Sequence, residues 1–258
     1  MTATPSDITS IAPRRTRIRW KIFTLLFSFG LMAYVQQRSL AVASYQMMPS
    51  LNLSQMQIGW LEWAFLLGYA ALQFPGGVLG QRLGARSTFV LIGLLSLICT
   101  VTTPLAPVVL TGTALFAVLL GVQLLLGLAQ GPIFPVTAGV VEAWFKPDQW
   151  SLVQGLLSLG LGLGAAVAPP VVAWLMSSFG WQRALAWTTL PALLLTAVWA
   201  WYARNTPAEH PAVSPAELSE LDTRSASNAD CSISWRRLSA LLKSRDLLAL
   251  TVSYGCMN

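Results

Sequence analysis

The chain has 258 residues, of which 55% are apolar and only 10% are charged, and its mean hydropathy is +0.60. Soluble domains carry about one-quarter charged residues, so this composition excludes an ordinary soluble domain and indicates a membrane protein. The net charge of +6 does not indicate nucleic-acid binding, because the basic residues lie in short patches between apolar runs. Three scattered cysteines and one distant histidine, His210, predict neither a metal site nor a disulfide framework, and we expect no cofactor.

Residues 1–20 form a polar, basic leader, which we expect to lie in the cytoplasm. A cleaved secretory signal is the alternative, because the basic region, the apolar core and Ala41-Val42-Ala43 mimic its three parts. Gln36, Gln37 and Arg38 interrupt that core, and more apolar runs follow it. These two features favour the leader.

Six apolar runs follow, each near or above the roughly 20 residues that a helix needs to cross a bilayer. They cover residues 21–47, 58–80, 88–107, 112–142, 152–178 and 184–202. The predicted fold is therefore an all-α membrane protein in which residues 21–203 form a six-helix bundle. The fourth run is longer than a span requires and holds Gly131-Pro132 and Pro135, so we expect a kink or an extension beyond the bilayer there.

The basic residues predict the orientation of the bundle. With the N-terminus inside, all sixteen Lys and Arg lie on the cytoplasmic side except Arg38, within the first span, and Arg183, at the outer start of the sixth. Cytoplasmic loops of membrane proteins carry an excess of Lys and Arg, so we expect a cytoplasmic N-terminus.

The sequence after the sixth span divides into a polar and an apolar part. Residues 204–246 are rich in proline and acids and predict a central cytoplasmic loop, with a short helix beginning at the capping-box sequence Ser214-Pro215-Ala216-Glu217. Residues 247–258 are apolar but too short to span a bilayer. They predict the start of a seventh transmembrane helix, and we expect the chain to be part of a longer protein.

Polar side chains interrupt the first span. Tyr34, Gln37, Arg38 and Ala41 follow one another at i, i+3, i+4 and i+7, so they share one helical face. An ionised group costs several kcal/mol at the bilayer centre unless it faces protein or a wet cavity. This face therefore predicts a polar site inside the bundle.

Two further pairs of polar residues share a helical face, Tyr69 with Gln73 in the second span and Gln123 with Gln130 in the fourth. Hydrogen bonds between helices are one explanation for each of them. The other is a cavity lined by hydroxyl groups, amides and the Arg38 cation, and such a lining suits a polar organic anion.

Glu62 and Glu142 are the acids within the apolar runs, and both lie near an end of their run. They are either interfacial and structurally paired, or one of them titrates as part of a proton pathway. The sequence leaves both explanations open.

The loop between the second and third spans reads Gly76-Gly77-Val78-Leu79-Gly80-Gln81-Arg82-Leu83-Gly84-Ala85-Arg86. It resembles the cytoplasmic loop signature of the major facilitator superfamily, with Gly77, Arg82, Gly84 and Arg86 matched and Gln81 in place of an aspartate. Glycine permits a tight turn, and the arginines can bind helix C-termini or acids on a neighbouring half. Basic residues beside a glycine turn are the simpler explanation for this loop alone.

Further segments come in the order and spacing of the anion:cation symporter branch of that superfamily. They are residues 40–44, 73–77, 131–135, 144–145, 168–175, 234–238 and 253–257. The resemblance covers nearly the whole chain from Arg14 on. It implies a carrier of hexuronates, aldonates or related carboxylates.

The departures from this branch concern its charged positions. Its members carry Asp-Arg after the first-span tyrosine, and an arginine and an acid in the fourth span, where this sequence has Gln36-Gln37, Gln123 and Gln130. Arg38 is displaced by one residue from the usual arginine. One residue rotates a side chain by about 100° on a helix, so Arg38 replaces that arginine only if the helix is locally adjusted.

The sequence thus predicts secondary active or facilitative transport of a small organic anion, a sugar acid or other carboxylate, by alternating access across the plasma membrane, here a bacterial inner membrane. The implied partners are the lipid bilayer and a missing C-terminal six-helix half, and no nucleic acid. The sequence has no Walker-type glycine loop, paired carboxylates or nucleophile with histidine in its spans, so we expect no enzyme. The alternative is a non-transporting membrane protein or a degenerate carrier fragment, which the loss of titratable positions favours.

Overall fold

The structure is a computed structural model that describes residues 16–215 and 217–218. Most of the predicted leader and central loop, and all of the predicted start of a seventh helix, lie outside the described residues. The described part is helical and contains no strand. Its elements are α1 (Ile18–Leu51), α2 (Gln55–Leu83), α3 (Ala85–Val109), α4 (Gly112–Gln130), α5 (Ile133–Trp144), α6 (Pro147–Phe179), α7 (Trp181–Tyr202) and the short η1 (Pro207–Glu209).

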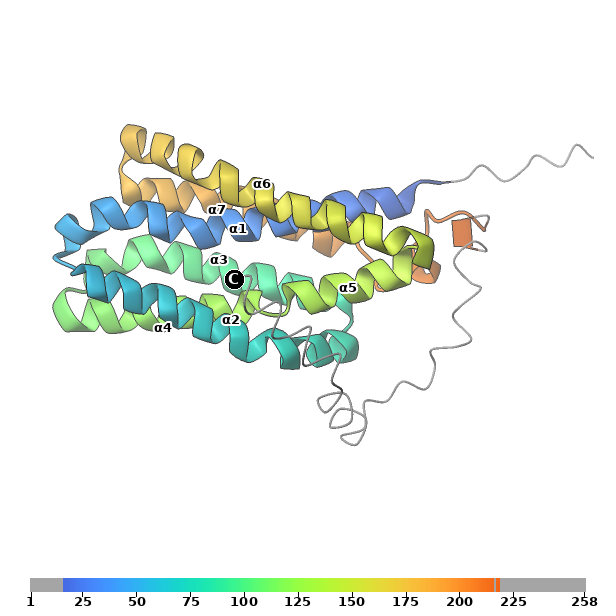
Figure 1. Cartoon of the computed structure of the whole chain (residues 1–258), viewed down its shortest axis with the longest axis horizontal. Helices are drawn as coiled ribbons and strands as arrows, with labels where there is room; N and C mark the ends of the chain where they lie inside the picture. Colours follow the sequence, from blue (N-terminus) through green and yellow to red (C-terminus); the bar gives the residue numbers. More distant parts are fainter. Residues whose placement is uncertain (1–15, 216, 219–258) are drawn as a thin grey trace, which may run out of the picture. The chain divides into compact units, whose positions relative to one another are not determined.

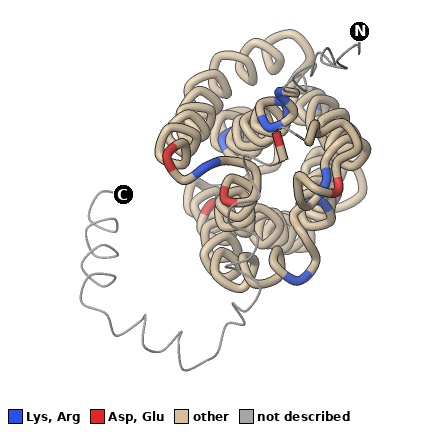
Figure 2. The backbone as a smooth tube through the Cα atoms, turned by 90° about the vertical axis from the view of Figure 1, so that its right-hand side faces the viewer, with Lys and Arg blue, Asp and Glu red and all other residues tan. Residues whose placement is uncertain are grey.

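Each of the six predicted spans is helical, and the helices lie side by side along one direction (Figure 1). Five segments are long and apolar enough to cross a membrane: α1, α3, the α4–α5 segment Gly112–Trp144, α6 and α7. α2 is as long as a span, with 29 residues, but several glutamines, Glu62 and Arg82 make it more polar. Seen from one end, charged positions are few among the described helices (Figure 2).

The irregularity predicted in the fourth span is confirmed. α4 ends at Gln130, and α5 begins at Ile133 after a turn at Gly131-Pro132. Pro132 and Pro135 have no N–H to donate to the preceding turn, so the helical hydrogen-bond ladder is interrupted between the two helices.

Local sequence signals determine where α1 ends and α2 begins. Asn52 closes α1 in the left-handed conformation, with φ of 53°. Ser54 begins α2 with a capping box: its Oγ accepts a hydrogen bond from the Gln57 N–H at 3.2 Å, and its own N–H donates to Gln57 Oε1 at 2.8 Å. The connection is therefore short, and the two helices run in opposite directions.

The closest packing pairs α1 with α6, α2 with α4, and α3 with α7. A Cβ atom added at Gly127 of α4, or at Gly131 directly after this helix, would collide with the backbone of α2. Likewise, a Cβ at Gly160 or Gly164 of α6 would collide with α1. Small residues at helix crossings let membrane helices approach closely, and these four glycines serve that purpose.

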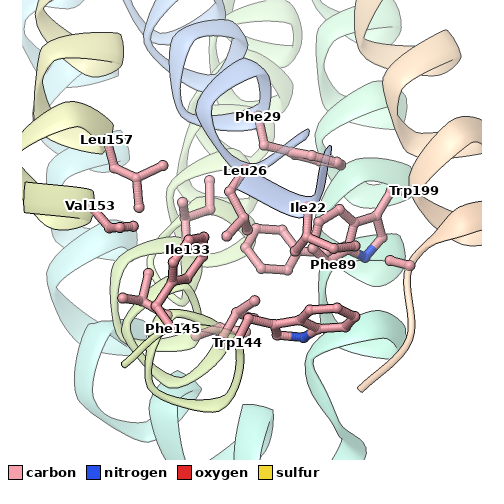
Figure 3. Close-up of a cluster of buried hydrophobic side chains, with 14 of the residues drawn as sticks. Ile22, Leu26, Phe29, Phe89, Ile133, Trp144, Phe145, Val153, Leu157 and Trp199 are labelled. Atoms are coloured by element: carbon pink, nitrogen blue, oxygen red, sulfur yellow. The ribbon is translucent and has the colours of Figure 1, made fainter. Parts of the chain in front are cut away.

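Two large buried apolar clusters fill the bundle, with polar residues between them, and a smaller third consists of Phe65, Cys99 and Leu126. The first includes Leu26, Phe29, Phe89, Trp144 and Trp199 (Figure 3). The second includes Leu40, Ala43, Met47, Leu61 and Val172. Along α1, the buried Gln36 lies between the residues of the first cluster and those of the second.

The segment after α7 folds back onto the start of α1. The predicted cap at Ser214 is present, since its Oγ accepts from the Glu217 N–H at 3.3 Å. The Glu217 carboxylate does not close the box on Ser214; it accepts from Thr16 Oγ1 at 2.7 Å and from the Arg19 N–H at 3.4 Å. Glu217 therefore caps the first turn of α1 from a distant part of the chain.

Candidate functional site

Side chains from three helices face one pocket of about 100 Å³. α1 contributes Gln37 and Arg38, α2 contributes Glu62, and α4 contributes Gln123. Apolar residues complete the lining: Leu40, Ala41, Phe65 and Leu66. The structure thus brings together three of the polar residues predicted to line a site, and adds the acid of the second span.

Arg38 is exposed at this pocket although it lies far inside α1. At 1.5 Å per residue it is roughly 30 Å from the start of the helix at Ile18 and roughly 20 Å from its end at Leu51. The opposite side of the helix is buried, with Gln36, Ser39, Leu40 and Ala43 spaced i, i+3, i+4 and i+7. This periodicity turns the guanidinium outward from the bundle's core.

Arg38 and Glu62 carry opposite charges beside the same pocket. Within the described residues, no ion pair or hydrogen bond engages either side chain. Both charged groups therefore remain available to a bound molecule.

Gln123 forms the inner wall of the pocket. Its side chain is only 4% exposed, so packing fixes the position of the amide. Gln37 is half-buried on the neighbouring helix. A carboxamide both donates and accepts hydrogen bonds, so these two residues offer both kinds of partner to a polar molecule.

Gln130 lies outside this pocket and pairs with Gln36. Its Nε2 donates to Gln36 Oε1 over 3.2 Å, and both side chains are buried. They line a separate cavity of about 20 Å³ together with Ser96 and Thr196. Gln36 Nε2 and Ser96 Oγ are buried without a hydrogen-bond partner among the described residues. Gln36 was absent from the predicted site, although the spacing of Gln36 with Ser39, Leu40 and Ala43 marks a buried face.

The three remaining polar candidates also lie outside the lining of the charged pocket. Tyr34 is half-buried and packs closely against Gly164 of α6. A Cβ atom added to this glycine would lie only 3.1 Å from Tyr34 Cβ. Tyr69 stacks on Phe65, with ring centroids 6.0 Å apart. Gln73 is exposed one turn further along α2. Phe65 lines the pocket, so Tyr69 packs against one residue of the pocket wall.

Glu142 is exposed two residues before the end of α5. α5 ends where α6 begins, whereas Glu62 lies near the start of α2, at the other end of the bundle. The two acids therefore do not belong to one site. Among the described residues, no group of three or more His, Cys, Asp or Glu side chains is placed to hold a metal ion.

The loop signature joins α2 to α3 and binds the end of α7. Gly84 has φ of +80°, and a Cβ there would collide with the Asn205 side chain. Arg86 Nε donates to the Ala200 carbonyl in the last turn of α7 at 3.0 Å, and its backbone N–H donates to Asn205 Oδ1 at 2.9 Å. One of the predicted arginines therefore does bind a helix C-terminus.

The other residues of the loop signature take different positions. Gln81 and Arg82 are exposed in the last turn of α2. Gly77 and Gln81 line a second pocket of about 270 Å³ with Pro135, Gly139 and Asn205. This pocket is lined mainly by small and apolar residues and holds no charged group.

The described helices and the charged pocket define a helical membrane bundle with a polar site on one face. A family model described as Major Facilitator Superfamily matches residues 22–258, and the chain belongs to this family. Its members are transporters, in agreement with the resemblance noted in the sequence.

Curated relatives agree with this assignment. The chain is 25% identical to the probable galactarate/D-glucarate transporter GudP of Bacillus subtilis, over 97% of this chain and 57% of the relative. It is 27% identical to the probable sulfoacetate transporter SauU of Cupriavidus necator, over 87% of this chain and 51% of the relative. It is 29% identical to a hexuronate transporter of Bacillus subtilis, over 77% of this chain and 46% of the relative. The chain thus spans about half the length of the curated relatives it matches.

Solved structures share the fold. The proton:xylose symporter XylE bound to 6-bromo-6-deoxy-D-glucose superposes with a TM-score of 0.65 at 14% identity, over 73% of this chain and 45% of that one. A bacterial homologue of the human lysosomal transporter Spinster, inward-facing and unoccupied, superposes with a TM-score of 0.64 at 17% identity, over 75% of this chain and 45% of that one. At these identities the likeness concerns the fold alone.

Proposed function

We propose that this chain supplies the N-terminal half of a secondary transporter for a small organic anion, a sugar acid or other carboxylate. In this proposal residues 1–20 are a cytoplasmic leader and 21–203 form the half-bundle. Residues 204–246 are the central cytoplasmic loop, and 247–258 begin a seventh helix. The relatives named as carriers of galactarate or D-glucarate, hexuronate and sulfoacetate support an anionic substrate.

The observation that carries the proposal is the exposed Arg38 beside a small pocket. A guanidinium presents a planar fork of N–H donors that matches the two oxygens of a carboxylate. Gln37 and Gln123 supply neutral hydrogen-bonding groups next to it. Together they suit a substrate with one anionic end and a polar body.

The size of the pocket supports a site shared between two halves. Complete small-molecule sites measure roughly 300–1,000 Å³, whereas the pocket of Arg38 measures about 100 Å³. Transporters built from two repeats bind substrate where the repeats meet, near the middle of the membrane. A C-terminal six-helix half would provide the opposite wall, and rocking of the halves would open the site to each side in turn.

The same arrangement explains why the exposed charge is tolerated. A charge on a lipid-facing surface at this depth would be costly, but one in a water-filled cavity between halves is not. The distribution of Lys and Arg supports a cytoplasmic N-terminus and a multi-pass protein of the bacterial inner membrane.

Arg38 provides the test of this function. In the full-length carrier, Arg38→Lys keeps the charge but loses the two-pronged geometry, so affinity for the transported anion should fall by about tenfold or more. Arg38→Ala should remove binding. Arg183→Lys, at the exposed start of α7, is the matched control and should leave affinity unchanged.

Uptake and binding are measured in reconstituted vesicles with and without the substitutions. Residues 1–258 alone should insert into the membrane but not transport. Unchanged anion affinity in Arg38→Ala would make Arg38 a packing or topology residue and refute the proposal. Transport by residues 1–258 alone would refute the need for a second half.

A further inference from the structure

The charged pocket contains an acid as well as a base, and this combination bears on the charge of the substrate. Arg38 reaches the pocket from α1 and Glu62 from α2. Both are exposed. They form no ion pair with each other, so their charged groups lie more than 4 Å apart along the pocket wall.

Each charged group prefers a different part of a ligand. The guanidinium attracts one carboxylate. The Glu62 carboxylate accepts hydrogen bonds from hydroxyl or amine groups and repels a second negative charge, and this repulsion is strong where little water intervenes. A repulsive group of this kind is an effective way to reject a competing ligand.

Resting on the proposed function, we infer that the pocket selects a polyhydroxylated monocarboxylate, with its carboxylate on Arg38 and its hydroxyl groups on Glu62, and rejects dicarboxylates of the same skeleton. Glu62 is thereby a specificity residue. A plain hydrocarbon acid is a poorer fit, because it offers Glu62 no donor. The buried amide of Gln123 completes the polar wall between the two ends.

Three six-carbon compounds that differ in charge test the inference: sorbitol, D-gluconate and D-glucarate, which are neutral, singly and doubly charged. Their binding to the full-length carrier is measured by competition and by titration calorimetry. We expect D-gluconate to bind at least about tenfold more tightly than either of the others. A tenfold ratio corresponds to about 1.4 kcal/mol.

Variants of Glu62 identify the cause of the preference. Glu62→Gln should improve D-glucarate binding and narrow the gluconate-to-glucarate ratio by about tenfold, whereas Glu62→Asp keeps the charge and should keep the preference. Glu209→Gln, the same change at an exposed position beyond α7, is the control and should leave the ratio unaltered.

The outcomes separate the inference from the proposed function. A carrier that binds sugar acids in an Arg38-dependent way but prefers D-glucarate overturns the inference and leaves the function standing. The same holds if Glu62→Gln leaves the ratio unaltered, or if only anions other than sugar acids bind through Arg38. A protein that binds no organic anion through Arg38 overturns both.

Discussion

Gln130 of α4 donates a hydrogen bond to Gln36 of α1, with 3.2 Å between Nε2 and Oε1, in a buried layer between two apolar clusters. The two residues are 94 positions apart in the sequence. The bond ties the first span to the end of the α4 helix, directly before the Gly131-Pro132 turn. It lies in a small cavity of its own, apart from the pocket of Arg38.

Removing one partner of this pair should cost more than removing both. Gln130→Leu leaves the Gln36 carbonyl buried without a donor, and such a loss typically costs about 1–3 kcal/mol. The double variant Gln36→Leu with Gln130→Leu removes both polar groups, and its cost should be clearly less than the sum of the two single costs. Thermal unfolding in detergent gives the stability of the wild type, of Gln36→Leu, of Gln130→Leu and of the double variant. Strict additivity would show that the two amides are not coupled.

The sequence predicted the helices well because a bilayer imposes a length and an apolar character on each span. Their ends were less predictable, since hydrogen-bonding caps set them. The first apolar run predicts 21–47, but α1 continues to Leu51 and stops where Asn52 adopts a left-handed conformation. The break in the fourth span was readable because glycine and proline act locally.

The site was only partly predictable, because it depends on how helices cross. Arg38 and Gln123, both predicted to line a polar cavity, do line one pocket. Gln130 shares a face with Gln123 but lies seven residues on, roughly 10 Å further along the helix, and there it meets Gln36 instead. The approach of Glu62 to Arg38 depends on the packing of α2, about which spacing within one helix carries no information.

The crossing of α2 and α4 should be sensitive to a single methyl group. A Cβ at Gly127 would overlap the Phe65 backbone, which cannot move as a flexible side chain can, so Gly127→Ala should destabilise the protein by about 1–3 kcal/mol. Gly121→Ala is the matched control on the same helix, because its Cβ would meet no atom within 4 Å. Apparent unfolding temperatures of the two variants make the comparison. Equal values would show that the crossing adjusts freely.

The histidine beyond α7 should make the docking of that segment depend on pH. His210 is buried against the rings of Trp144 and Tyr202, with centroids 6.0 and 4.9 Å away. Burial, followed by the positive charge of Arg204, lowers the pKa of His210 below its ordinary value of 6.5. Lys21 also lowers this pKa, while the Tyr202 backbone and Glu217 raise it.

A lowered pKa means that the docked segment is more stable with a neutral His210 side chain than with a protonated one. The stabilisation is therefore fully present above pH 6.5, and it is lost as the pH falls below that value, because protonation favours the released segment. Proteolysis within residues 207–218 should accelerate as the pH falls below 6.5, relative to a His210→Phe variant that keeps an aromatic ring. Parallel pH profiles for the two proteins would contradict the prediction.

The carrier should be coupled to protons weakly or not at all. Coupling requires a group that changes charge in the working pH range, and the carboxamides of Gln36, Gln37, Gln123 and Gln130 do not titrate. Glu62 and Glu142 are the only acids within the six apolar runs of the sequence, and Glu142 lies at the far end of the bundle from the pocket of Arg38.

Uptake into vesicles with and without an imposed pH gradient, at constant voltage, measures this coupling. We expect accumulation to be nearly independent of the gradient. Gln130→Glu, which places a titratable group in the buried layer next to Gln36, should make transport depend on pH where wild-type transport does not. Accumulation that is driven by the gradient and abolished in Glu62→Gln would refute the prediction and assign the coupling to Glu62.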